Sequence, residues 1–174
     1  MQLLAALLPT GSNAPLLRSP LPRGRPMPDT PTMVVGVHLV LVKDGRVLLG
    51  RRRNTAFAED HWHVPAGHLL EGESITRGMV READEELGIT IREEDLDLVH
   101  AVHHLDADDG KGRLQLFFKP RAYVGQITNR EPEKCHELKY WPIRELPAPV
   151  VDYTTHALGR ITAGSLVSVY GWSA

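Results

Sequence analysis

Hydrophobic and polar positions along this chain of 174 residues follow two periods, one typical of strands and one of a helix. Residues 34–42 form an aliphatic and β-branched run, and the Asp44-Gly45 pair, a hairpin turn signal, separates it from a second run at 47–50. Further strands are predicted at residues 62–64, 96–105, 114–124 and 138–141. The chain therefore begins its patterned part with a hairpin and contains several later strands.

One strongly amphipathic helix interrupts these strands. Its apolar face repeats every four residues, at Ile75, Met79, Ala83 and Leu87. Ser74 is a good N-cap and Gly88 a natural C-terminal stop, so the helix is expected between them. A second helix is predicted over residues 153–161. Strands on both sides of a central helix predict an α/β fold with a mixed sheet and helices packed on it.

The first 32 residues lack such a pattern. Residues 9–32 are rich in Pro, Ser, Gly and Arg, which predicts a disordered or loosely packed extension over 1–32. Residues 33–174 are then expected to form one domain. The apolar fraction of 42% and the charged fraction of 24% are ordinary for a soluble globular protein.

Charge and cysteine content narrow the partners and the compartment. The formal net charge is −2, so the basic surplus of a protein that binds polymeric nucleic acid is missing. Small phosphorylated molecules remain suitable partners, and both a monomer and a homodimer are open. The single cysteine, Cys135, cannot form an internal disulfide, and no apolar run approaches the ~18 residues of a membrane helix. We therefore expect a cytoplasmic protein that does not enter a membrane.

Acidic residues crowd the last two turns of the central helix, at Glu82, Asp84, Glu85 and Glu86. Each is disfavoured there by roughly 0.3–1 kcal/mol, because a helix C-terminus carries partial negative charge. Glu82 and Glu86 also repel each other at a spacing of four residues. A solvated acidic face is one interpretation. A bound divalent cation is the other, since it would reverse the sign of the electrostatic cost.

Carboxylates that converge from one rigid helix suit a hard cation such as Mg²⁺. The preceding loop, residues 67–73, could offer it a backbone carbonyl. Such an ion would screen phosphate charge, orient a diphosphate and lower the pKa of a bound water. The proton acceptor stays open between Glu85 and an acid outside the helix, for which the turn with Asp108 and Asp109 is the candidate.

The spacing of these residues resembles a known motif. The chain has Gly67, Glu73, Arg81-Glu82-Ala83, Glu85-Glu86 and Gly88-Ile89. This is similar to the Nudix box, G-x5-E-x7-R-E-U-x-E-E-x-G-U, where U is apolar, and all seven specified identities match. The predicted order of strand, loop, helix and strand also agrees with the motif.

The resemblance implies an α/β/α sandwich with a mixed sheet, in which the box forms a loop-helix-loop. It implies Mg²⁺- or Mn²⁺-dependent hydrolysis of a nucleoside diphosphate linked to another moiety, X. By position, Glu82, Glu85 and Glu86 match the metal-binding carboxylates, and Gly67 matches the glycine whose carbonyl often completes the metal shell. One departure is Ala66, where many members have glycine, and it puts the geometry of the metal loop in question.

The two remaining charged residues of the box are Glu73 and Arg81. By position they match a pair that has a structural role within the catalytic site. Arg81 is expected to hold acidic side chains in place, and its position as a cation inside an acidic turn points the same way.

Substrate signals are fewer. Residues 131–135, followed by Trp141-Pro142 and Leu146-Pro147, resemble a stretch in the nucleoside-triphosphate-cleaving, MutT-like branch. That branch cleaves nucleoside triphosphates to the monophosphate and pyrophosphate and includes enzymes that clear oxidised or noncanonical nucleotides. Two alternatives stay open. One is a non-catalytic sensor of nucleotides or sugar phosphates, and the other a hydrolase of nucleotide sugars, prenyl diphosphates or RNA 5′ ends.

Several residues outside the acidic cluster are candidates for substrate binding. They are Arg51, Arg53, His68, Trp141, Asp152 and Tyr153. The arginines could grip phosphates or lie in a solvated loop, and at least one of the run 51–53 should point away from any cleft. Trp141 could stack on a base or belong to the core, and Asp152 could read a base edge or cap the last helix.

Overall fold

The computed structural model describes residues 32–172. The predicted extension over residues 1–32 lies outside the described residues except for Thr32. Twelve elements follow in chain order: β1 Val34–Leu39, β2 Val42–Lys43, β3 Arg46–Arg52, β4 Trp62–His63, β5 Ala66–His68, α1 Ile75–Leu87, the 3₁₀ turn η1 Glu93–Asp95, β6 Leu96–Leu105, β7 Gly112–Pro120, β8 Cys135–Pro142, α2 Asp152–Thr162 and β9 Val167–Tyr170.

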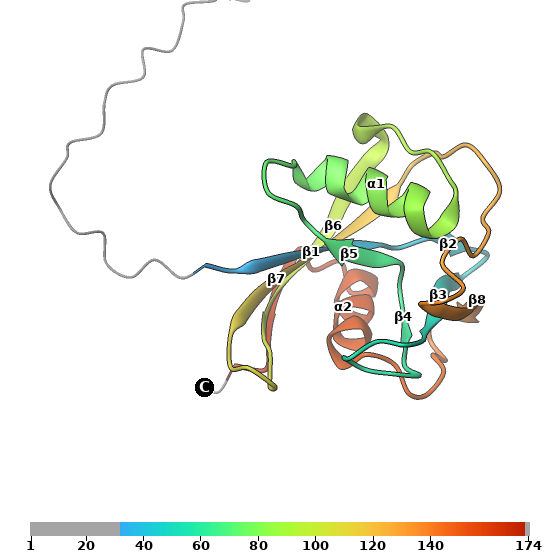
Figure 1. Ribbon diagram of the computed structural model, residues 1–174. Helices are drawn as coiled ribbons and strands as arrows, with labels where there is room; N and C mark the ends of the chain where they lie inside the picture. The colour runs from blue at the N-terminus through green and yellow to red at the C-terminus, as the bar shows by residue number, and fades with distance from the viewer. Residues whose placement is uncertain (1–31, 173–174) are drawn as a thin grey trace, which may run out of the picture. The chain divides into compact units, whose positions relative to one another are not determined.

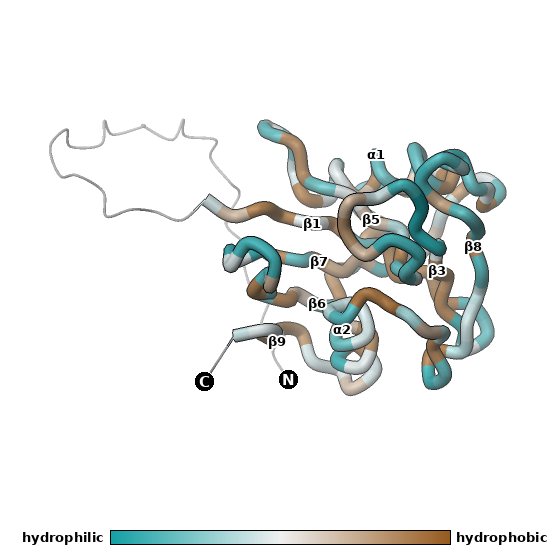
Figure 2. The backbone as a smooth tube through the Cα atoms, turned by 60° about the horizontal axis from the view of Figure 1, so that its bottom comes forward, coloured by the Kyte–Doolittle hydropathy of each residue, from teal (hydrophilic) through white to brown (hydrophobic). Residues whose placement is uncertain are grey.

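The strands form two sheets. The larger has the order β5-β1-β7-β6-β9 and is mixed, because β1 runs parallel to β7 and β6 parallel to β9 while the other pairs are antiparallel. Figure 2 shows β1, β7, β6 and β9 side by side in this order. In the smaller sheet, β3 pairs with β2, β4 and β8.

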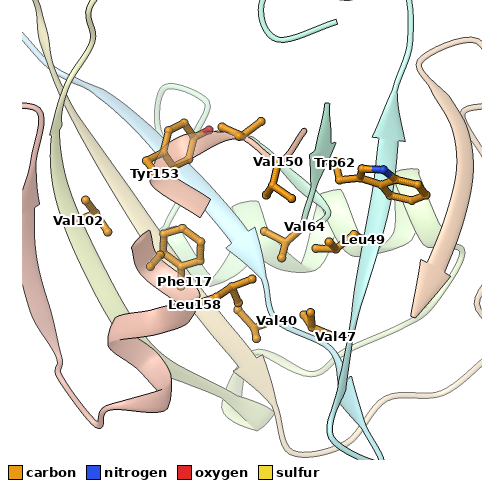
Figure 3. Close-up of a cluster of buried hydrophobic side chains, with 12 residues drawn as sticks. Val40, Val47, Leu49, Trp62, Val64, Val102, Phe117, Val150, Tyr153 and Leu158 are labelled. Carbon is orange, nitrogen blue, oxygen red and sulfur yellow. The ribbon is translucent and has the colours of Figure 1, made fainter. Parts of the chain in front are cut away.

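Helices α1 and α2 cover opposite faces of the larger sheet (Figure 1). Successive residues of β1 and the residue after it therefore enter different cores: Val37 and Leu39 pack beneath α1, whereas Val40 packs beneath α2. Figure 3 shows the α2 core, in which side chains from the strands meet those of the helix. Burial on both faces explains why residues 34–42 are mostly apolar, and the exception, His38, lines the cavity described below. The predicted α/β/α sandwich is confirmed.

The central helix has the predicted limits and caps. The backbone N–H of Arg77 donates to Ser74 Oγ at 3.2 Å, and Gly88 ends the helix in the left-handed conformation with φ of 68°. Met79, Ala83 and Leu87 are fully buried. This apolar face fixes the rotation of α1 on the sheet, and so fixes where its acidic residues point.

Other predicted limits were wrong. Strand β7 ends at Pro120 rather than at 124, and β8 begins at Cys135, earlier than 138. Strands β5 and β9 were not anticipated, because each is short and gains its strand conformation from pairing, β5 with β1 and β9 with β6. Among the described residues, no helix is long and apolar enough to cross a membrane.

Candidate active site

A cavity of about 590 Å³ opens between α1, the larger sheet and the loops around it. One end of this cavity, which we call the glutamate end, is formed by Gly67, Glu82, Glu85 and Glu86. The three glutamates come from the last turns of α1, and Gly67 comes from β5 beside them. The structure therefore brings together all four residues that sequence reasoning assigned to metal binding.

Close packing between β5 and α1 explains which residues stand at positions 66 and 67. A Cβ at Gly67 would overlap the Glu82 carboxylate, so this carboxylate can lie against β5 only if residue 67 is glycine. The backbone N–H of Ala66 donates to Glu86 Oε2 at 3.0 Å, which ties the same strand to the helix. Ala66 has no positive φ, so its methyl group introduces no backbone strain there.

Arg81 ties the acids of the box to one another. Its guanidinium contacts both Glu73 oxygens, at 3.0 and 3.1 Å, and Glu82 Oε1 at 2.6 Å. It also contacts Glu85 Oε2 at 3.1 Å and the His68 carbonyl at 3.1 Å. These bonds lower the pKa of Glu73 and raise that of Arg81. Neither Glu73 nor Arg81 lines the cavity, which suits the structural part that the resemblance gives them.

Burial disfavours the ionised form of two carboxyl groups at the glutamate end. It raises the pKa of Glu86 to about 8, assisted by the charge of Glu82 and opposed by the Ala66 N–H. It also raises the pKa of Glu82, although Arg81 is bonded to that carboxylate. Hard oxygen donors that resist ionisation without a cation form a donor set that fits Mg²⁺ or Mn²⁺.

A second group of metal-type ligands lies away from the cavity lining. Glu59, Asp60 and His136 place one ligand atom each within 4.8 Å of the others, and all three are exposed. Their carboxylates already have partners: Glu59 accepts the Thr55 N–H at 2.8 Å, and Asp60 pairs with Arg51 at 3.4 Å. Sequence reasoning missed this group, because residues 59–60 and 136 share no local pattern.

Another part of the cavity lining, which we call the histidine wall, consists of His38, His63, His104, Gln115 and Tyr153. His63 bonds to the Tyr153 hydroxyl at 3.1 Å and to Thr154 Oγ1 at 2.8 Å. Burial lowers the pKa of His38 to about 4 and that of His63 well below its usual value. It also raises the pKa of Tyr153 to about 12. The wall is therefore polar but uncharged at neutral pH.

An acidic turn borders the cavity beside this wall. Arg113 Nε donates to Asp106 Oδ2 at 2.5 Å, and Arg113 Nη2 donates to Asp109 at 3.0 Å. Asp108 and Asp109 both line the cavity. Glu85 lines it too and has a half-exposed side chain. The sequence-based alternatives for the proton acceptor thus all border the same space, and the choice among them stays a prediction.

The candidates for substrate binding separate into two groups. His68 and Tyr153 line the cavity, whereas Arg51, Arg53, Trp141 and Asp152 do not. Of the three consecutive arginines, Arg52 lines it. Period-two alternation could have identified Arg52, because it shares a strand face with Gly50, which also borders the cavity.

Contacts elsewhere account for the residues outside the cavity. Arg53 donates to the Pro132 carbonyl at 3.3 Å, and Trp141 packs edge-on against Trp62 with ring centroids 5.3 Å apart. The prediction that Asp152 caps the last helix was wrong, because Val151 is the N-cap and Asp152 is the first helical residue. An acid in the first turn still interacts favourably with the helix dipole.

The model of the NUDIX domain matches residues 30–158. The chain belongs to the Nudix family. A solved MutT NUDIX hydrolase from Burkholderia pseudomallei has 30% sequence identity and a TM-score of 0.67, and the match covers 74% of this chain and 98% of that one. The Nudix fold and the Nudix box predicted from the sequence are therefore confirmed together.

Two curated relatives extend the comparison. Low-salt glycan biosynthesis protein Agl8 of Haloferax volcanii is 39% identical over 79 residues, which cover 45% of this chain and 49% of the relative. Nudix hydrolase 5 of Arabidopsis thaliana is 30% identical over 111 residues, which cover 61% of this chain and 35% of the relative. The matched segments thus span half or less of these relatives' own length.

Proposed function

We propose that this Nudix protein hydrolyses a diphosphate linkage in a nucleoside diphosphate linked to X, with Mg²⁺ as its metal and Mn²⁺ as a substitute. The preferred substrate is a nucleoside or deoxynucleoside triphosphate, cleaved to the monophosphate and pyrophosphate, with oxidised or noncanonical nucleotides among the candidates. One observation carries the proposal. Glu82, Glu85, Glu86 and Gly67 border a cavity that is large enough for a nucleotide.

The glutamate end would hold the metal and the phosphates. Glu82, Glu85 and Glu86 would be ligands, together with the Gly67 carbonyl. When bound, the metal would supply charge neutralisation for the diphosphate and a water of lowered pKa. Arg81, fixed on both oxygens of Glu73, would keep Glu82 and Glu85 in position. An acid on the cavity, either Glu85 or one of the acidic-turn aspartates, would accept the proton.

Two findings support a nucleotide as the substrate. The histidine wall is uncharged and partly aromatic, so it suits a nucleobase better than a second phosphate group. A structure with 30% identity is that of a MutT hydrolase, in agreement with the sequence segment at 131–135. The name of the Haloferax relative gives a reason to test nucleotide sugars as well. We expect the protein to act on small molecules in the cytoplasm.

A metal-dependent screen tests this proposal. Nucleoside triphosphates, dinucleotides and nucleotide sugars should be incubated with and without Mg²⁺, and released phosphate and pyrophosphate counted separately. We expect pyrophosphate from triphosphates and a large loss of turnover in Glu85→Gln.

Asp84→Asn is the matched control, because Asp84 lies on the same helix, does not line the cavity and only pairs with Arg130 at the surface. Equal turnover in the two variants would contradict the metal assignment. Tight binding without any turnover would indicate a sensor instead.

A further inference from the structure

Gln115 lies on the floor of the cavity, at the centre of the larger sheet. It belongs to β7, is only 5% exposed and stands in register with Gly36 of β1. A Cβ at Gly36 would overlap Gln115 Oε1. The glycine therefore leaves the space that the Gln115 amide occupies.

His38 fixes the orientation of this amide. Its Nε2 lies 2.8 Å from Gln115 Oε1, and its ring stacks on Phe117 with centroids 4.5 Å apart and planes at 17°. Burial lowers the pKa of His38 to about 4, so the ring is neutral at pH 7 and carries one N–H. An amide oxygen only accepts hydrogen bonds, so this N–H sits on Nε2 and donates to Gln115.

The amide nitrogen of Gln115 is left with its two donor hydrogens. Within residues 32–172 it has no hydrogen-bond partner, and Gln115 lines the cavity. The nitrogen is not among the fully buried polar atoms without a partner, so it is accessible from the cavity, where a ligand that accepts a hydrogen bond can reach it. Burial also lowers the pKa of His104, and the positive charge of Arg113 is paired with Asp106.

We propose that Gln115 selects a nucleobase that carries a ring carbonyl, by donating from its amide nitrogen to the carbonyl oxygen. His38 and Gly36 are positioning residues, one holding the amide oxygen and the other leaving room for it. A base with an exocyclic amino group at that place would bring a donor against a donor. The inference rests on the proposed function, since phosphates at the glutamate end place the base on the histidine wall.

The selection is tested by pairs of substrates in which a ring carbonyl and its neighbouring ring N–H are replaced by an amino group and an unprotonated ring nitrogen. The values of kcat/KM should be measured for ITP against ATP and for UTP against CTP. We expect at least one pair to favour the keto member by about tenfold. In Gln115→Met, which keeps the size and removes the donor, the ratio should fall to near one. A preference for the amino members, or a ratio unchanged in Gln115→Met, would overturn the proposal.

Three variants test the positioning residues by the same ratio. His38→Phe keeps a ring on Phe117 but loses the N–H, so the keto preference should fall severalfold, mainly through KM. His38→Gln restores a donor and should recover part of the preference. Gly36→Ala should displace the Gln115 amide and lower the ratio, and it should also lower Tm, because a Cβ there lies only 2.9 Å from Nε2 of the buried His38 ring. Melting temperatures that fall while the ratio holds would show a purely structural role.

Binding measurements separate this inference from the proposed function. Calorimetry with the α,β-methylene analogues of ITP and ATP, in the presence of Mg²⁺, needs no turnover. A keto preference in binding without hydrolysis of any substrate would support Gln115 selection and refute the hydrolase. Hydrolysis with equal kcat/KM for both members of each pair would refute the selection alone.

Discussion

The glutamate end and the histidine wall both contain titratable groups that are withdrawn from solvent, and burial favours the neutral forms of these groups. It raises the pKa of Glu82 and Glu86 and lowers that of His38 and His63. The outcomes differ, because an imidazole can stay neutral and still make its hydrogen bonds, whereas these carboxylates need a cation to act as charged ligands. One cavity thus holds an end whose carboxylates suit a metal and a wall whose histidines are neutral without one.

The largest expected effect tests the glutamate end. Glu86→Gln keeps an acceptor for the Ala66 N–H and removes the buried acid. With substrate and Mg²⁺, kcat/KM should fall roughly 10²–10³-fold, the range seen when one preorganised electrostatic partner is lost. Without metal, the free energy of unfolding at pH 7 should rise by on the order of 2 kcal/mol, because the folded parent must protonate a group that is ionised in the unfolded chain.

The pH dependence of the free energy of unfolding tests the same shift in the pKa of Glu86. The pKa of Glu86 is raised from 4.5 to about 8, so the metal-free parent should lose stability as the pH rises through that window. Denaturant titrations of parent, Glu86→Gln and Asp84→Asn across this range measure the slope, which should become shallower only in Glu86→Gln, because Glu82, whose pKa is also raised, is retained there. Loss of activity together with loss of stability would show that Glu86 is needed for folding rather than for metal.

The same contrast explains how far the sequence could predict the site. The glutamate end lies within the continuous stretch 67–86, so spacing alone identified it. The histidine wall joins residues far apart in the chain: 77 positions separate His38 from Gln115, and 90 separate His63 from Tyr153. No local pattern marks such pairs, because they meet only through the parallel pairing of β1 with β7 and the placement of α2. The three-residue strand β5 escaped prediction for a similar reason.

A smaller effect tests the histidine wall. The pKa of His38 is lowered from 6.5 to about 4. Between these two pH values the unfolded chain therefore binds a proton at His38, whereas the folded protein does not. The parent should therefore lose stability as the pH falls from 6.5 to 4, with a contribution of about 3 kcal/mol from this residue. Chemical denaturation of His38→Phe across that window should show a shallower slope, whatever its absolute stability.

His61→Phe is the control for this slope, because His61 precedes β4, is not fully buried, and has a side chain that bonds only to the Glu59 carbonyl among the described residues. The parent slope should persist in that variant. If His38→Phe and His61→Phe have the same slope as the parent, the histidine wall is not held neutral by burial, and its contrast with the glutamate end fails.

The smallest expected effect lies where β5 meets α1. Gly67→Ala places a methyl group on the Glu82 carboxylate, which is 12% exposed and held by Arg81 at 2.6 Å, so the carboxylate must move and weaken that contact. We expect kcat/KM to fall about 10–100-fold, the range for disturbed support of a metal ligand, together with weaker Mn²⁺ binding by titration. Gly159→Ala is the control, because a Cβ there meets nothing within 4 Å, and that variant should keep full activity. An unchanged Mn²⁺ affinity in Gly67→Ala would mean that Glu82 holds no metal. The contact with Arg81 would then be what holds the Glu82 carboxylate in place.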